Sequence, residues 1–238
     1  AMVFDDCPPY PAERERVAAA VERTARWAAE CREQPRADGQ LVFGIVQGGC
    51  HADLREHSAV DITALDFDGH AIGGLSVGEP EPEMLAMAGH TAPMLPADKP
   101  RYAMGLGTPA QLVELVARGV DLFDCVLPTR LARNGTAFTY DGAFALKGAA
   151  YKEDFAPIEA GCDCFTCTHH TRAYVRHLLN VDEILGLRLL TLHNLRLYLR
   201  LMADVRKHIE SGTFGRFRAE FAARYTPTTR VAAQRKNA

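Results

Sequence analysis

The amino-acid sequence predicts an α/β fold in which strands and helices alternate along the chain. Apolar runs typical of buried strands recur at intervals of roughly 20 to 40 residues, the span of one βα unit. Several of these runs end in small residues, as at Gln47-Gly48-Gly49 and Gly105-Leu106-Gly107. Such alternation is typical of a doubly wound sheet or a (β/α)8 barrel, and both folds place ligand sites at the carboxyl ends of the strands.

Five parallel strands are expected from these apolar runs. They are Met2–Phe4, Leu41–Val46, His70–Leu75, Arg101–Leu106 and Val120–Val126. No GxGxxG motif follows the first strand, so the sequence favours a barrel over a dinucleotide-binding sheet. Because five βα units cannot close eight strands, we predict an incomplete (β/α)8 TIM barrel over residues 1–130. The chain opens inside a strand, so three units would be missing upstream.

Helices are expected between the strands, at Pro11–Glu33, Cys50–Leu65 and Glu81–Met94. Thr108-Pro109 fits a helix N-cap followed by proline at the first helical position.

After Val126 the pattern changes. Arg133-Asn134-Gly135 and Tyr140-Asp141-Gly142 predict tight turns of β-hairpins. We assign residues 131–170 to a β insertion with a metal-binding subdomain, and residues 171–238 to basic C-terminal helices that supply a metal ligand. The helical segment is expected over about 171–209, with a break near Gly186, before a polar terminus.

The composition excludes a disordered or collagen-like chain, since 47% of the 238 residues are hydrophobic and 24% are charged. The apolar runs are far shorter than the roughly 20 residues that cross a bilayer, and the N-terminus does not have the layout of a signal peptide. We therefore expect a cytoplasmic protein without membrane contact.

The net charge of −3 conceals an uneven distribution. From Gly186 to Ala238 there are 11 Lys and Arg against 3 Asp and Glu, whereas the first 185 residues hold 16 against 27. The basic end predicts a surface that faces a polyanion. The alternative is a solvent-exposed helix face that is rich in arginine.

Three of the seven cysteines, Cys162, Cys164 and Cys167, lie within six residues. Three soft ligands in one loop suit tetrahedral Zn²⁺ once a fourth ligand is added. The candidates for that ligand are His169, His170, His177 and His193. We favour His193, because His169 and His170 are too close to Cys167 to close the tetrahedron without strain. A closed Cys₃His site would be structural.

Aspartates follow two of the predicted strands, at Asp5-Asp6 and at Asp124. A barrel presents catalytic groups at such positions, where an aspartate can act as a nucleophile, a general base or a hydrogen-bond acceptor. The alternative role is helix N-capping. Arg130 and Arg133 follow Asp124 and are either phosphate-binding cations or ordinary surface arginines.

Four motifs occur together with these residues. They are GIVQG at 44–48, GGLSVGE at 73–79, YAMGLG at 102–107 and FDCVLPTR at 123–130, the last followed by Arg133-Asn134-Gly135. In this combination the chain resembles the C-terminal two-thirds of bacterial tRNA-guanine transglycosylases, the queuine tRNA-ribosyltransferase family. The C-x-C-x₂-C and histidine signature falls at its expected place.

The resemblance implies a pentosyltransferase of queuosine biosynthesis. Such an enzyme exchanges guanine at the wobble position of tRNAs with G-U-N anticodons (Asp, Asn, His and Tyr) for preQ1. Asp124 matches the nucleophile that attacks the ribose anomeric carbon and holds the RNA covalently, as in a retaining glycosidase. Arg130 and Arg133 match anticodon-loop contacts. The family also implies a homodimer with the zinc region near its interface.

The resemblance also implies a base-binding set. Asp5 matches the carboxylate that accepts hydrogen bonds from the base, and Gln47 and the Gly74 N–H match the donors to its carbonyl. Leu75 matches the residue whose backbone carbonyl meets the aminomethyl group of preQ1, and Met104 matches one wall of the base slot. Cys7 and Val77 resemble the bacterial pocket, which takes the small precursor rather than queuine.

One departure from the family concerns its second catalytic aspartate and a base-stacking aromatic residue, which lie upstream of everything matched here. Either the chain is a piece of a longer product, or it is a shortened protein. A shortened protein would expose a strand edge, for which we expect aggregation, obligate pairing or loss of activity.

Two other functions are compatible with the sequence. The first is a non-catalytic, zinc-stabilised tRNA-binding subunit, although the presence of Asp124 argues against it. The second is a (β/α) metabolic enzyme braced by zinc, which would have no affinity for RNA.

Overall fold

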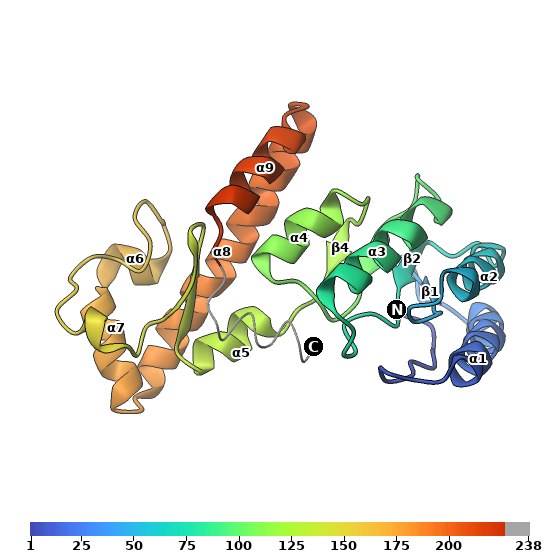
Figure 1. Ribbon diagram of the computed structural model, residues 1–238, viewed down its shortest axis with the longest axis horizontal. Helices are drawn as coiled ribbons and strands as arrows, with labels where there is room; N and C mark the ends of the chain where they lie inside the picture. Colours follow the sequence, from blue (N-terminus) through green and yellow to red (C-terminus); the bar gives the residue numbers. More distant parts are fainter. Residues whose placement is uncertain (227–238) are drawn as a thin grey trace. The chain divides into compact units, whose positions relative to one another are not determined.

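The structure is a computed structural model that describes residues 1–226. The described residues form two compact units, one made of Ala1–Leu106 with Glu114–Asp124 and the other of Gly107–Val113 with the chain from Cys125 onward (Figure 1). Residues 227–238, which include part of the basic end and of the expected C-terminal region 171–238, lie outside the described residues. Over residues 1–226, no helix is both long and apolar enough to span a membrane.

The first unit contains a four-stranded parallel sheet in the order β1-β2-β3-β4. The strands are β1 (Phe43–Val46), β2 (Gly69–Ile72), β3 (Arg101–Ala103) and β4 (Leu122–Phe123). Each strand is shorter than the sequence indicates, and β2 and β3 end just before the glycines at positions 73 and 105. The expected strand at Met2–Phe4 is reduced to one parallel bridge between Met2 and Phe43.

The helices of this unit follow the predicted order. They are α1 (Arg14–Arg32), α2 (Ala52–Thr63), α3 (Glu81–Thr91) with the 3-10 turn η1 (Ala92–Met94), and α4 (Pro109–Val116), which the two units share. Ile72 and Ala103 of the sheet belong to one buried cluster with Ile62 and Ala88 of the helices. Burial of this apolar surface is the main force that holds the helices on the sheet.

The second unit begins with α5 (Leu127–Arg133) and a two-stranded hairpin, β5 (Thr136–Thr139) and β6 (Gly142–Ala145). The turn at Tyr140-Asp141 is the predicted hairpin turn. The turn at Asn134-Gly135 is not a hairpin, because it follows the end of a helix that the sequence analysis did not predict. There the Gly135 N–H donates to the Ala132 carbonyl at 2.8 Å.

The rest of this unit is helical. It comprises η2 (Ala149–Tyr151), α6 (Phe165–His169), α7 (Arg172–Asn180), α8 (Ile184–Glu210) and α9 (Phe214–Arg224). Part of the segment that was expected to be a polar terminus therefore forms α9.

The predicted break in the helical segment occurs near Gly186 but not at the glycine itself. The chain leaves the helix between α7 and α8, where Asp182 has a φ of 54°, and Gly186 lies buried inside α8. A Cβ atom at Gly186 would come within 2.8 Å of the Leu178 Cβ atom. The glycine is therefore required for close helix packing and does not end a helix.

Candidate active site and metal centre

Asp124 lies at the carboxyl end of β4 and is exposed to solvent. Its Oδ1 atom accepts a hydrogen bond from the Tyr102 hydroxyl at 2.6 Å and another from the Gly105 N–H at 2.7 Å. Both hydrogen bonds of this carboxylate within residues 1–226 reach Oδ1. The geometry therefore fixes one oxygen and leaves Oδ2 available to a ligand, as a nucleophile requires.

The two adjacent aspartates near the N-terminus have different surroundings. Asp5 faces the end of β1, where the Gln47 side chain donates to its Oδ2 atom at 2.6 Å. Asp6 instead forms ion pairs with Arg16 and Arg23 of α1. The hydrogen bond from Arg16 is the chief cause that lowers the pKa of Asp6. Asp6 is thus bound to a helix. Asp5 instead lies with Cys7, Gln47 and Gly74, which we call the strand-end group.

Gln47, Gly74 and Cys7 gather next to Asp5. The Gln47 side chain is fully buried, and its Oε1 atom has no hydrogen-bond partner in the described part of the chain. Shielding of the Cys7 thiol from water raises its pKa, as does the nearby Asp5 carboxylate, whereas contacts with the Gly74 amide and Gln47 oppose the increase. These contacts place the four residues around one point.

Gly74 has a φ of +64°, which favours glycine. A Cβ atom at this position would lie only 2.3 Å from the Gln47 Oε1 atom. The backbone can therefore approach the buried amide only because residue 74 lacks a side chain.

The loop after β2 is held by Glu79, whose importance the sequence analysis did not identify. The residue is 2% exposed, and its carboxylate accepts hydrogen bonds from the backbone N–H groups of Ser76 and Val77. This arrangement fixes the backbone that follows Leu75, which is itself buried. Met104, after β3, is partly buried and packs against the same core.

Two cavities adjoin this strand-end group. One, of about 530 Å³, is lined by Phe4, Asp5, Trp27 and neighbouring residues of α1. The other, of about 180 Å³, is lined in part by Gly49, Gly74 and Val77. Of the predicted base-binding residues, Asp5 thus lines the first cavity, and Gly74 and Val77 line the second.

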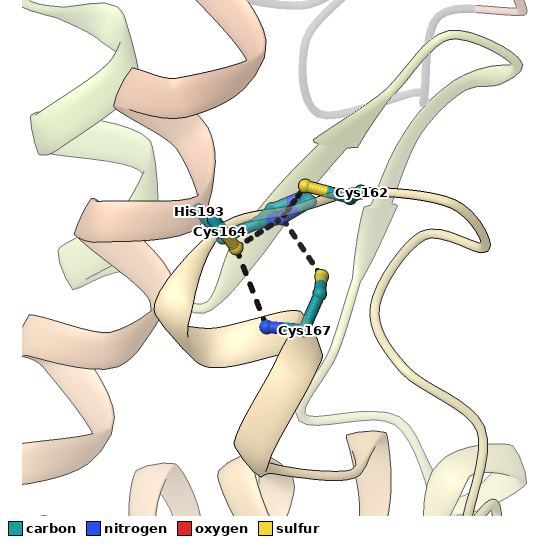
Figure 2. A group of neighbouring side chains, drawn as sticks. All are labelled: Cys162, Cys164, Cys167 and His193. Atoms are coloured by element: carbon teal, nitrogen blue, oxygen red, sulfur yellow. Dashed lines mark hydrogen bonds between the residues drawn. The ribbon is translucent and has the colours of Figure 1, made fainter.

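The second unit contains the cysteine cluster. Figure 2 shows Cys162, Cys164 and Cys167 around the ring of His193, which reaches them from α8. The His193 Nδ1 atom lies 3.8, 3.7 and 3.3 Å from the three sulfur atoms, in sequence order. A tetrahedral ion with N and S ligands separates such atoms by about 3.5 Å, so the four groups fit a metal site. The structure brings together the ligands that we favoured from the sequence.

The surroundings of His193 are also those of a ligand. The residue is completely buried, and its Nε2 atom lies 2.7 Å from the Phe138 carbonyl of β5. A histidine that donates to a backbone carbonyl through one ring nitrogen presents the other nitrogen to a metal. Four protein ligands leave no coordination position for water, so such a site would brace the fold.

Arg130 and Arg133 lie on α5 of the second unit, and both are exposed. In the described part of the chain, neither guanidinium forms a hydrogen bond or an ion pair. These side chains are therefore free to bind an anionic ligand.

A parallel sheet with polar groups at its strand ends, together with a Cys₃His cluster that could hold a metal ion, defines an α/β protein with a candidate metal site. Comparison with known proteins identifies the family within this class. The family model described as queuine tRNA-ribosyltransferase matches residues 1–227, and the chain belongs to this family.

Curated relatives carry the same name. The chain is 53% identical to the queuine tRNA-ribosyltransferase of Pelotomaculum thermopropionicum over 225 residues, which are 94% of this chain and 61% of the relative. It is 55% identical to that of Bacillus subtilis, covering 94% of this chain and 59% of the relative. The chain thus spans less than two thirds of the length of these proteins.

Proposed function

We propose that this chain carries the nucleophile and base-binding groups of a tRNA-guanine transglycosylase, which exchanges wobble guanine of G-U-N anticodon tRNAs for preQ1. One observation carries the proposal: Asp124 is exposed, and its Oδ1 atom is held by Tyr102 and Gly105 while its Oδ2 atom is free. This is the arrangement expected of a carboxylate that attacks a sugar carbon.

In the proposed reaction, the Asp124 Oδ2 atom forms a bond to the ribose anomeric carbon. The glycosidic bond breaks, and its electron pair leaves with guanine. The incoming base then attacks the same carbon through a ring nitrogen and expels Asp124, and the proton of that nitrogen passes in net to the released guanine. Two inversions thus retain the configuration of the sugar. The base must leave the anticodon stack for this attack, as loop bases of RNA readily do.

For base recognition, we assign the N–H groups of the heterocycle to Asp5 and its carbonyl to Gln47 and the Gly74 N–H. The contact between Asp5 and Gln47 supports this assignment. A bound base would replace it, with its N–H groups donating to Asp5 and its carbonyl accepting from Gln47. We place the aminomethyl group of preQ1 at the Leu75 carbonyl, with Met104 and Cys7 as pocket walls.

Three further parts of the proposal concern the rest of the protein. Arg130 and Arg133 would bind phosphates of the anticodon loop, consistent with their free guanidinium groups. Zn²⁺ is the metal that best suits three thiolates and one imidazole, and we expect about one equivalent per chain. We also propose a barrel architecture, a homodimer and a cytoplasmic location, in keeping with the family.

A denaturing gel tests the proposed reaction. The chain is incubated with anticodon stem-loop RNA, and a covalent complex should appear as a shifted band. The Asp124→Asn variant should give no such band, because an amide is a much weaker nucleophile. Asp121→Asn is the matched control: Asp121 is an exposed aspartate that precedes β4 and accepts a hydrogen bond from the Arg101 N–H.

A covalent band of equal intensity from Asp124→Asn would contradict the proposal. Salt-sensitive RNA binding without any covalent band would instead support the non-catalytic subunit.

A further inference from the structure

Arg55, on the first turn of α2, has a completely buried side chain. Its Nε atom donates to the Gly49 carbonyl at 2.6 Å, and one terminal nitrogen donates to the Gly73 and Gly74 carbonyls at 3.1 and 3.3 Å. The guanidinium thus joins the turn after β1 to the turn after β2. These are the turns that hold the strand-end group beside Asp5.

The contact with Gly73 has a direct consequence for Gly74. The Gly73 carbonyl and the Gly74 N–H belong to the same peptide group. A cation that binds the carbonyl oxygen draws electron density from the nitrogen and makes its N–H a stronger donor, since linked hydrogen bonds polarise one another. Arg55 therefore acts on the N–H that we assign to the carbonyl of the base.

The charge of Arg55 is offset only in part, because the Glu79 carboxylate interacts with it electrostatically without forming an ion pair. Within residues 1–226, no carboxylate lies within ion-pair distance of its guanidinium, and its other terminal nitrogen is buried without a hydrogen-bond partner. Burial lowers the pKa of Arg55 to about 10, so the group stays protonated at neutral pH. A buried cation without an ion-pair partner is costly, and ionisable groups perturbed in this way cluster at functional sites.

We propose that Arg55 is a positioning residue that polarises the Gly73–Gly74 peptide and so stabilises negative charge on the carbonyl oxygen of the departing base. When the glycosidic bond breaks, its electron pair passes to the base nitrogen and is delocalised onto this oxygen. A preorganised donor at that point stabilises the charge as an oxyanion hole does. This inference rests on the proposed function.

Equilibrium binding of two bases measures how Arg55 affects the Gly74 N–H as a donor to the base carbonyl. Guanine and 6-thioguanine share the N–H groups that Asp5 would bind and differ in the acceptor at carbon 6, where sulfur accepts a hydrogen bond more weakly than oxygen. Their dissociation constants are measured for the unsubstituted chain, for Arg55→Lys and for Arg55→Gln. Arg101→Lys is the matched control, because Arg101 also donates to backbone carbonyls but lies at the opposite end of the sheet.

The unsubstituted chain and Arg101→Lys should prefer guanine. In Arg55→Gln this preference should fall by a factor of about five, because the donor to the guanine oxygen is weakened, and in Arg55→Lys it should fall less. A merely structural role would weaken the binding of both bases equally, and an unchanged preference in both variants would overturn the inference.

Circular dichroism of each variant separates folding from function. If both Arg55 variants lose the native spectrum while Arg101→Lys keeps it, Arg55 serves folding and the inference is overturned. If the unsubstituted chain binds neither base, the proposed function fails together with the inference. If that chain binds guanine and only the Arg55 prediction fails, the proposed function stands.

Discussion

At the residue scale, the surroundings of each aspartate separate residues that look alike in the sequence. Asp6 is held by two arginines, Asp5 is paired with a neutral amide, and Asp124 is held through one oxygen only. Within residues 1–226, both oxygens of Asp6 accept from arginines, whereas Asp5 and Asp124 each keep one oxygen without a hydrogen bond, and of these two only Asp124 is exposed. The three aspartates therefore differ in their hydrogen-bond partners and exposure, and these surroundings decide what each carboxylate can do.

Tyr102→Phe tests how the Asp124 carboxylate is oriented. Burial and the hydrogen bond to Asp124 raise the pKa of Tyr102 to about 12, so its hydroxyl remains a donor throughout the neutral range. Loss of this donor leaves the Gly105 N–H alone on Oδ1. We expect the rate of covalent complex formation to fall by about tenfold or more, as measured on quenched denaturing gels.

Tyr151→Phe is the control for this substitution, because Tyr151 lies in the second unit and packs against Phe144. An unchanged rate in Tyr102→Phe would show that the Tyr102 hydroxyl does not orient the nucleophile.

His70 makes stability depend on pH. The ring is buried in β2 without a hydrogen bond from either nitrogen to any described residue. Burial and the nearby Lys99 lower its pKa, and Asp66 opposes this only in part. The unfolded chain binds a proton near pH 6.5, whereas the folded chain does so only at lower pH. Stability should therefore fall as the pH drops below about 6.5.

Urea unfolding at about pH 7.5 and about pH 5.5 checks this prediction. The loss of stability between the two conditions should be smaller in His70→Leu than in the unsubstituted chain, because the variant lacks the titrating group. Equal losses would show that other groups cause the acid sensitivity.

At the scale of elements, α8 organises the second unit. It carries His193 and also Asn194, whose buried amide donates to the Pro128 and Thr136 carbonyls at 3.0 Å and accepts from the Phe138 N–H at 3.0 Å. One side chain thus ties the helix to α5 and to the hairpin. This role was not predictable from the sequence, because an asparagine on a helix usually faces solvent.

Asn194→Ala should destabilise the protein by about 2–4 kcal/mol, because three buried backbone groups lose their partner. Chemical denaturation measures this change. Asn180→Ala, at an exposed asparagine of the same unit, should cost less than about 1 kcal/mol. Equal costs for the two variants would contradict the role assigned to Asn194.

The sequence predicted the elements that have strong local signals. Strands β1 to β4 and helices α1 to α3 were predictable from apolar runs and helix-forming stretches, and the cysteine spacing indicated the metal ligands. Helix α5 was missed, because Pro128 at its first turn is also typical of a loop. The break near Gly186 was predictable, but the packing role of the glycine was not, because close contact with Leu178 is a tertiary feature that a sequence does not display.

The strand-end group was predictable only in part. The resemblance indicated Asp5, Gln47 and Gly74, but not the residues that hold them. Arg55 and Glu79 act through backbone groups, and both lie in stretches where a charged residue normally faces solvent.

At the scale of the whole molecule, the two units have separate sources of stability. The first is held by a sheet covered with helices, and the second has its own buried cluster next to the Cys₃His group. A structural metal contributes folding energy on the order of 10 kcal/mol, so its loss should act mainly on the unit that binds it.

Metal removal tests this division. After chelation, hydrogen exchange should accelerate in the β5–β6 hairpin, in α6 and in α8, while the amides of β1 to β4 should keep their protection. Cys164→Ser should reproduce the effect and lower the metal content below one equivalent, whereas Cys31→Ser, in the first unit, should not. Uniform loss of protection throughout the chain would show that the units do not unfold separately.

The central claim is that Asp124 forms the covalent bond to RNA, and the site of attachment tests it most directly. The covalent complex is digested with protease and nuclease, and the peptides are analysed by mass spectrometry. We predict a nucleotide adduct on the peptide that contains Asp124, with fragment ions that place it on that residue. An adduct on any other residue, or an equal yield of adduct from Asp124→Asn, would contradict the account.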